Sequence, residues 1–137
     1  DYYQYLRMLE EVMIRTLSDY SIWAIRRNGY TGVWVNKSKI GFVGVRIAMG
    51  YTMHGFSLNV NNDLNPFNHI IPCGIQGVRI TSISELLNAD VDIKEVFDSL
   101  VYHYSDIFRV QMTSIKLNTI VQKTCSVMAE CDNLVSQ

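Results

Sequence analysis

Cys73 is the residue of this sequence whose surroundings best suit nucleophilic chemistry. It lies in a Pro-Cys-Gly tripeptide, residues 72–74, within a short apolar stretch. Proline lacks a backbone N–H and glycine has no side chain to pack, so the tripeptide does not fit a regular helix or a central strand. It therefore predicts a bend on which the sulfur can face a cleft. Because cysteines in apolar stretches are more often merely buried, the position alone leaves catalysis open.

The other cysteines and the histidines show no spacing typical of a metal site. The sequence has three cysteines and three histidines. An odd, low cysteine count argues against a disulfide scaffold and suits a reducing compartment. Cys125 and Cys131 are interpreted as small side chains of a helix. His54 is expected to be a hydrogen-bonded structural residue, and His69 and His103 are expected at the surface or the core edge. We therefore expect no metal.

Length, charge and hydropathy exclude several classes of protein. The 137 residues are enough for one domain with a sizeable core. The formal net charge is −1 and basic residues do not cluster, which argues against binding to nucleic acid. No apolar run approaches the roughly 20 residues of a membrane helix. A single globular domain is expected.

The elements that must position this cysteine follow from hydrophobic periodicity. An apolar stripe at three- and four-residue intervals predicts a helix over residues 1–19. Residues 31–35 are rich in β-branched and aromatic side chains and predict a short strand. The runs 39–48 and 51–60, separated by a Met-Gly break at 49–50, predict a hairpin.

The second half of the chain predicts turns and helices. Pro66 favours a helical turn, and Ser-Ile-Ser-Glu at 82–85 matches a capping box that starts a short helix. Residues 92–108 predict a helix with one continuous apolar face, made by Ile93, Val96, Phe97, Leu100, Val101, Tyr104 and Phe108. Residues 109–137 are expected to form a strand or two and then a helix. This order predicts the α+β class, with a mixed or antiparallel sheet and packed helices.

Three blocks of sequence together resemble the octanoyltransferase family, of the lipoate–protein ligase B type. They are GYTGVWV and KIGFVGVR in 29–46, HGFSLNV and DL in 54–64, and PCGI and TS in 72–82. The spacing from Lys39 to Cys73, 73 − 39 = 34, is also similar to that of the family. The resemblance implies that residues 1–108 are the C-terminal portion of the catalytic domain. Residues 109–137 are expected to be a tail of the same domain.

The resemblance implies roles for particular residues. Cys73 matches the cysteine that carries the acyl group as a thioester, and Lys39 matches a lysine that favours the thiolate and serves as acid and base. Without the resemblance, Lys39 would be interpreted as a solvated charge at the end of a strand. An ammonium beside a thiol suits such a role because it stabilises the thiolate by charge. The implied substrate-binding residues are Phe42, Val43, Gly44, Gly55, Phe56 and Ser57.

The implied reaction moves an octanoyl or lipoyl group from acyl carrier protein to a lysine of a lipoyl domain, in lipoate biosynthesis. The acceptors expected are the lipoyl domains of 2-oxoacid dehydrogenases or the glycine cleavage H protein. No cofactor is expected, because a thioester donor is already activated. The implied fold is that of the catalytic domains of biotin and lipoate ligases. The implied location is the bacterial cytoplasm or an organelle matrix, mitochondrial or plastid.

The family usually carries a further N-terminal segment that forms much of the acyl-binding wall. No matching stretch is found in this sequence, which opens at Asp1 in a helical pattern. We therefore expect a chain truncated at the N-terminus, which is either a fragment or a protein that has lost this segment, with Cys73 facing solvent in the second case. The chain alone is expected to be inactive or unstable.

Two other functions remain open. One is a non-catalytic module that binds a lipoyl domain or acyl carrier protein. The other is a relative of the ATP-dependent lipoate ligases, which share the fold by resemblance but lack a catalytic cysteine. The cysteine at 73 argues against the ligase, and dependence on ATP would support it.

Overall fold

The computed structural model, which describes residues 1–115, begins with the helix predicted over residues 1–19. Helix α1 spans Tyr2–Asp19, and the Asp1 carboxylate caps it by accepting the Tyr3 N–H at 3.0 Å. Its apolar stripe is buried at Leu9, Val12, Met13 and Leu17. The carboxylate of Glu10 is buried on the same stripe, which the periodicity did not predict.

Within the described residues, five strands form one mixed sheet. Strands β1 (Ile25–Arg27), β2 (Tyr30–Val35), β3 (Ser38–Ala48) and β4 (Tyr51–Leu58) are antiparallel neighbours in that order. The short strand β5 (Arg79–Ile80) pairs with β3 in parallel. The sequence did not predict β1, because it is only three residues long and carries two arginines instead of an alternating apolar pattern.

The predicted hairpin of β3 and β4 is confirmed. Its pairing runs without a break from Gly41 opposite Leu58 to Ala48 opposite Tyr51. Met49 and Gly50 form the turn, and their φ angles are 51° and 82°. Two central residues with positive φ match the right-handed twist of the two strands, so this tight turn fixes the register of the hairpin.

Two short 3₁₀ helices and helix α2 follow the hairpin. η1 spans Asn65–His69, η2 spans Pro72–Gly74 and α2 spans Ile83–Leu87. η1 and α2 agree with the predicted helical turn and short helix, and η2 occupies the predicted bend. The Ser82 hydroxyl accepts the Glu85 N–H at 3.1 Å, which is half of the predicted capping box. The Glu85 carboxylate instead accepts the Thr81 hydroxyl.

The segment from Asn59 to Thr81, which carries Cys73, is closed at its root. Asn59 N–H donates to the Ile40 carbonyl, and Thr81 N–H donates to the Lys39 carbonyl, both at 3.0 Å. The buried Asn59 amide also donates to the Thr81 carbonyl at 3.0 Å. Both ends are therefore bound to adjacent residues of β3 and to each other. Asn59 thus links the two ends of this segment.

Helix α3 spans Ile93–Phe108 and confirms the helix predicted over residues 92–108. Its predicted continuous apolar face is wrong at one end. Val96 is buried, but Ile93 and Phe97 are exposed, because α3 meets α1 along a narrower stripe than the periodicity implied. Residues 110–115 form no helix or strand, so no strand begins there. The remainder of the predicted C-terminal elements, with Cys125 and Cys131, lies outside the described residues.

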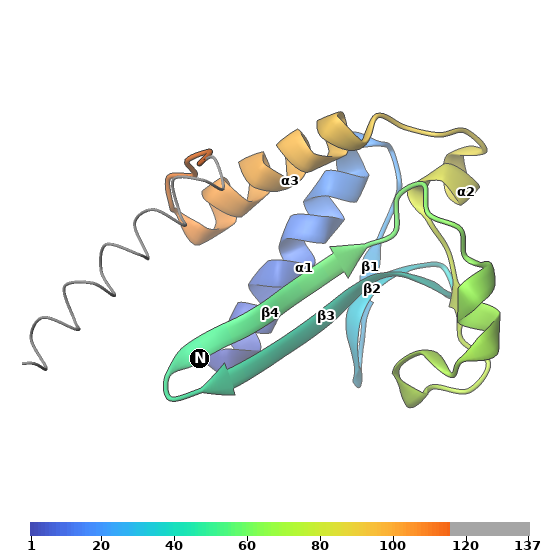
Figure 1. Ribbon diagram of the computed structural model, residues 1–137, viewed down its shortest axis with the longest axis horizontal. Helices are drawn as coiled ribbons and strands as arrows, with labels where there is room; N and C mark the ends of the chain where they lie inside the picture. Colours follow the sequence, from blue (N-terminus) through green and yellow to red (C-terminus); the bar gives the residue numbers. More distant parts are fainter. Residues whose placement is uncertain (116–137) are drawn as a thin grey trace, which may run out of the picture.

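The elements stack in layers. Helix α1 packs against β2, β3 and β4, and α3 packs against α1 (Figure 1). η1 and η2 lie beyond the end of the sheet opposite the β3–β4 turn (Figure 1). The α+β class with a mixed sheet and packed helices is confirmed. No helix of the described residues is long and apolar enough to cross a membrane.

Asp19 joins α1 to α3 and predicts an acid-sensitive contact. Ser99 Oγ donates to Asp19 Oδ2 at 2.6 Å, and His103 Nε2 lies 2.9 Å from the same oxygen. The Ser99 hydrogen bond, opposed by burial and helped by His103, holds the pKa of Asp19 below its ordinary value. A depressed folded pKa means that the carboxylate stabilises the fold above its unfolded pKa. This stabilisation is lost as the pH falls through the folded pKa.

Asp19→Asn should lower the free energy of unfolding at pH 7 by up to about 1 kcal/mol, since the carboxylate is half-exposed. The difference from the unmodified protein should vanish in acid, below the ordinary pKa of 3.8. Urea unfolding at a series of pH values measures both effects. Asp98→Asn is the control, because Asp98 forms only an exposed pair with Lys94 within α3. An Asp19→Asn protein that loses as much stability on acidification as the unmodified protein would contradict this role.

Candidate functional site

Cys73 lies in the middle of η2, on the bend that the sequence predicted. Its φ is 54°, in the left-handed region, and that of Gly74 is 69°. This conformation raises the free energy of a residue with a side chain by roughly 1–2 kcal/mol. Two backbone bonds hold the turn, from Gly74 N–H to Ile71 and from Ile75 N–H to Pro72, each 3.1 Å long. The thiol is free and exposed, so the strained turn presents the sulfur at the surface.

Lys39 reaches this sulfur from β3. Its side chain is only 2 % exposed, in contrast to the solvated strand-end charge that its residue type alone would suggest. Lys39 Nζ donates to the Thr31 carbonyl at 2.8 Å and to Cys73 Sγ at 3.3 Å. The lysine–cysteine juxtaposition expected from the sequence is therefore present in the geometry.

The Lys39 ammonium lies beside two aromatic rings and has no carboxylate partner among residues 1–115. Nζ lies 5.5 Å from the centre of the Trp34 ring and 5.0 Å from that of Phe42, where the ring faces attract a cation. Within residues 1–115, no carboxylate forms an ion pair with Lys39. A buried charge is costly unless polar groups surround it, and the groups that this ammonium contacts are the Thr31 carbonyl and the Cys73 sulfur.

Gly32 makes room for the lysine. Its φ is 117°, and a Cβ atom there would lie 2.6 Å from Lys39 Cε and 2.5 Å from the Gly41 carbonyl oxygen. Neither distance is tolerated between non-bonded atoms. The absence of a side chain at position 32 therefore lets Lys39 cross β2 toward Cys73.

An open groove adjoins the sulfur. Its volume is about 380 Å³, and its lining includes Cys73 and all six residues expected to bind substrate. These six are Phe42, Val43, Gly44, Gly55, Phe56 and Ser57. His54, which was expected to be a hydrogen-bonded structural residue, is exposed and also lines the groove. The β3–β4 pairing thus gathers two separate stretches of sequence beside one thiol.

The strand register divides these lining residues between two faces. Gly44 pairs with Gly55 across the hairpin, and a Cβ on either would meet nothing within 4 Å. Val43 pairs with Phe56, and both also pack against the hydrophobic core. Since neighbouring residues of a strand point to opposite faces, the glycine pair forms the floor of the groove. Val43 and Phe56 support that floor from the core.

Phe42 stands between the groove and the ammonium. It lines the groove, and its ring stacks on that of Phe67 with centroids 5.8 Å apart and planes 4° from parallel. This contact ties η1 to β3. It fixes an aromatic wall beside Lys39 and Cys73.

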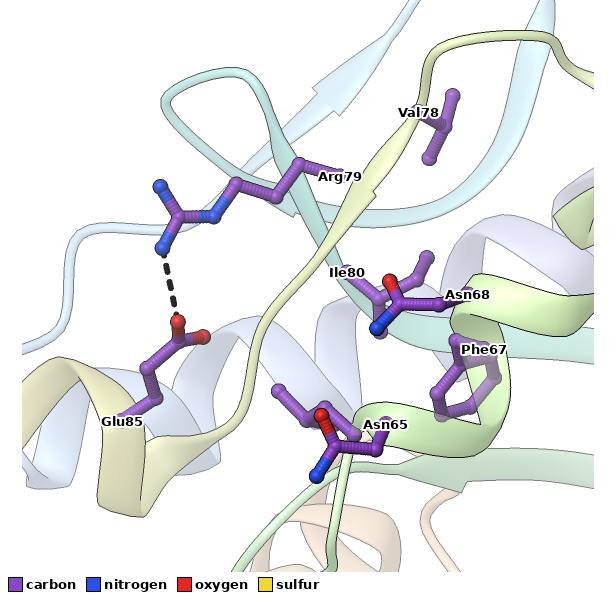
Figure 2. Close-up of a pocket in the computed structure, with 8 residues that line it drawn as sticks. Asn65, Phe67, Asn68, Val78, Arg79, Ile80 and Glu85 are labelled. Atoms are coloured by element: carbon purple, nitrogen blue, oxygen red, sulfur yellow. Dashed lines mark hydrogen bonds and ion pairs between the residues drawn. The ribbon is translucent and has the colours of Figure 1, made fainter.

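A second hollow of about 260 Å³ lies between η1 and β5 (Figure 2). Figure 2 shows the Arg79–Glu85 ion pair, 2.8 Å long, at its edge. The hydrogen bond from Thr81, together with that from Arg79, holds the pKa of Glu85 below its ordinary value. This carboxylate is ionised and paired, and the lining contains no nucleophile. This hollow therefore offers no counterpart to the Cys73 thiol.

Sequence reasoning missed Glu10 and Gly32. Glu10 lies four residues after Leu6 and three before Met13, so it occupies the apolar stripe of α1. A carboxylate at such a position was a usable sign of a buried contact. Gly32 belongs to the block 29–35 that carries the family resemblance. That its missing side chain makes room for Lys39 follows only from the path of the lysine across β2. His103 lies near Asp19 with its side chain 13 % exposed, and His69 is exposed, both away from the groove lining.

The sequence is similar to known proteins along most of its length. The family described as "Lipoyl protein ligase A/B catalytic domain" matches residues 1–105. An octanoyltransferase of Christiangramia forsetii is 43% identical over 118 residues, which cover 82% of this chain and 50% of that protein. A chloroplastic octanoyltransferase of Arabidopsis thaliana is 40% identical over 122 residues, 82% of this chain and 44% of that protein. The chain spans about half the length of the curated relatives it matches.

Solved structures share the fold at low sequence identity. A lipoate-protein ligase A bound with ATP superposes with a TM-score of 0.65 at 18% identity, over 85% of this chain and 51% of that one. The biotin protein ligase of Aquifex aeolicus superposes with a TM-score of 0.61 at 21% identity, over 77% and 45% of the two chains. The expected likeness to biotin and lipoate ligase catalytic domains is confirmed at the level of the fold.

Gly32→Ala should destabilise the fold and move Lys39 away from Cys73. The added Cβ must displace backbone at Gly41 or the lysine side chain, which typically costs roughly 1–3 kcal/mol. Urea unfolding measures the stability, and the rate of Cys73 alkylation reports on the lysine. Gly29→Ala is a matched control, because its φ is also positive, at 80°, but nothing lies within 4 Å of its Cβ. Equal effects of the two substitutions would show that backbone strain, not the close approach of Lys39, explains Gly32.

Proposed function

Because the chain belongs to the lipoyl protein ligase A/B catalytic domain family and resembles its octanoyltransferases, we propose that it transfers octanoyl groups through a thioester on Cys73. The donor is octanoyl-acyl carrier protein. The acceptor is a lysine of a lipoyl domain, in a 2-oxoacid dehydrogenase or the glycine cleavage H protein. A lipoyl group can take the place of the octanoyl group.

One observation carries this proposal. A lysine ammonium that is 2 % exposed, without a carboxylate partner among the described residues, donates to a cysteine sulfur 3.3 Å away. A purely structural lysine has no reason to be buried against a thiol. A thiolate supports this burial, and a thiolate is both a good nucleophile toward thioesters and a good leaving group.

The first half-reaction charges Cys73. The Cys73 thiolate attacks the carbonyl carbon of the donor thioester, and a new C–S bond forms. The bond to the pantetheine sulfur breaks, and Lys39 gives its proton to this departing thiolate. Octanoyl-Cys73 and a neutral Lys39 amine remain.

The second half-reaction delivers the acyl group. The neutral amine of the acceptor lysine attacks octanoyl-Cys73 and forms the amide bond. The Lys39 amine takes the proton that the attacking nitrogen loses, and the C–S bond breaks to release the Cys73 thiolate. The ammonium and thiolate are then restored. Both steps exchange acyl groups without a metal, nucleotide or other cofactor.

The groove suits the acyl chain. Its volume of about 380 Å³ lies toward the lower end of the roughly 300–1,000 Å³ typical of small-molecule sites. The Gly44–Gly55 floor lets a chain lie directly on the backbone of the hairpin. Phe42 closes the side next to Lys39 with an apolar wall, and Ser57 pairs with Phe42 across the strands.

The place of action follows from the relatives. Proteins similar to this chain include bacterial octanoyltransferases and a chloroplastic one. We propose the bacterial cytoplasm or an organelle matrix, where both acyl carrier protein and lipoyl domains are found.

The chain on its own is expected to have little activity, so incubation with octanoyl-acyl carrier protein should add one octanoyl group, visible by intact mass, once the N-terminal segment usual in the family is supplied. Cys73→Ser should abolish the thioester adduct, because the alcohol is a far weaker nucleophile than a thiolate. Lys39→Met should slow its formation by roughly 10²- to 10⁴-fold, the usual contribution of a positioned acid–base group. Lys37→Met is the control, since Lys37 is an exposed lysine two positions away and should change nothing.

The alternatives give different results in the same experiment. Modification that requires free octanoic acid and ATP would support a ligase. Binding of acyl carrier protein or a lipoyl domain without any adduct, with that N-terminal segment supplied, would support a non-catalytic module. Either result would reject the transferase.

Gly55→Val should shorten the groove. The added side chain occupies open space, since nothing lies within 4 Å of a Cβ atom at this position, so long acyl chains lose their floor. Formation of the octanoyl adduct should slow by roughly tenfold, a typical effect of one methylene in an apolar pocket. Formation of a butyryl adduct should change much less. Thr52→Val, an exposed position of β4 outside the groove, is the control. Equal slowing of both donors would mean that the acyl chain lies elsewhere.

A further inference from the structure

A single peptide group connects Lys39 to a buried carboxylate on α1. The Thr31 carbonyl accepts the Lys39 ammonium at 2.8 Å. The N–H of the same peptide group belongs to Gly32, and it donates to Glu10 Oε1 at 2.7 Å. The two bonds lie on opposite sides of one rigid, planar unit. Whatever fixes the N–H therefore also fixes the direction of the carbonyl.

The distortion of β2 makes this peptide group available. The register of β2 shifts against β1 between Ile25 and Arg27, and against β3 between Val33 and Trp34. Gly32 lies within the distorted stretch, with a φ of 117° that residues with side chains rarely adopt. A bulge of this kind turns peptide groups out of the regular ladder. Glu10 and Lys39 serve as the partners of the turned group.

Glu10 is itself held firmly in place. Its side chain is fully buried, and its second oxygen accepts Arg7 at 2.7 Å and lies 3.2 Å from Arg26 Nε. The charged groups that face the carboxylate are thus Arg7 of α1 and Arg26 of β1, with the Gly32 N–H coming from β2. A carboxylate fixed by two arginines is a stationary acceptor for that N–H.

We propose that Glu10 is a positioning residue for Lys39, acting through the Thr31–Gly32 peptide. This rests on the proposed function, in which Lys39 activates Cys73. By accepting the Gly32 N–H, Glu10 aims the Thr31 carbonyl at the ammonium. It also polarises that carbonyl, because hydrogen bonds in a chain strengthen one another. The carbonyl then holds Lys39 Nζ beside Cys73 Sγ. Helix α1, which contributes no residue to the groove, takes part in the chemistry in this way.

The reactivity of Cys73 toward iodoacetamide tests this without any acyl transfer. The full chain is used with Cys125→Ser and Cys131→Ser, so that intact mass reports alkylation of Cys73 alone. Rates are measured from pH 5 to pH 9 for this protein, Glu10→Leu, Glu10→Gln and Lys39→Met. Thermal unfolding of each variant is recorded in parallel, because a merely structural role would lower its stability without moving the pH profile.

Glu10→Leu should slow alkylation at pH 7 by roughly two- to tenfold, the effect of one lost hydrogen bond, and shift the profile toward that of Lys39→Met. Glu10→Gln keeps an acceptor oxygen without the charge, so its profile should lie between Glu10→Leu and the unmodified protein. Glu11→Gln is the matched control. It removes the neighbouring carboxylate and a partner of Arg26, but Glu11 does not touch Gly32, so its profile should not move.

If folded Glu10 variants retain the pH profile of alkylation of the unmodified protein while Lys39→Met changes it, the positioning role of Glu10 is overturned. The proposed activation of Cys73 by Lys39 then still stands. If Glu10→Leu does not fold, Glu10→Gln decides, and a profile identical to that of the unmodified protein overturns the proposal. If Lys39→Met itself leaves the profile unchanged, the failure lies in the proposed activation of Cys73 by Lys39. The two failures are thereby distinguished.

Discussion

A lysine ammonium withdrawn from water is the constraint around which this site is organised. Lys39 is almost fully buried, and within residues 1–115 it contacts a carbonyl, a sulfur and two aromatic rings but forms no ion pair. Water would stabilise such a charge far better than a carbonyl and two ring faces do. In the proposed mechanism a Cys73 thiolate supplies the opposite charge, so the contact that makes lysine burial tolerable is also the one proposed to activate the cysteine.

Several local irregularities serve this one contact. Gly32 adopts a conformation closed to other residues and leaves a gap through which the lysine passes. The register of β2 shifts on both of its edges. Cys73 adopts a left-handed conformation on a turn of three residues. Strain of this kind persists only where the surrounding structure holds it, and here β3 and α1 supply the regular framework. The regular parts of the fold provide stability, and the irregular parts provide the geometry of the site.

The sequence predicts the regular parts well, because local periodicity reports burial. The helix over 1–19 and the hairpin of 39–48 with 51–60 were predicted close to their observed bounds. The resemblance pointed to Lys39 and Cys73, and the fold brings these two residues into contact. Periodicity could not reveal that Glu10 meets the backbone of β2, since that contact depends on how α1 crosses a distorted strand. Nor could it divide the groove lining between two faces, because that depends on the register of the hairpin.

The closed root of the segment that carries Cys73 has a consequence for motion. Asn59 and Thr81 fasten both ends of this segment to adjacent residues of β3 and to each other. Opening of the segment breaks its own contacts, including the pairing of β5 with β3 and the stacking of Phe67 on Phe42, while β3 keeps its pairing with β2 and β4. Such a unit can unfold locally at a lower free energy than the whole domain. A local opening of this segment moves the Cys73 sulfur relative to the Lys39 ammonium, which stays with β3.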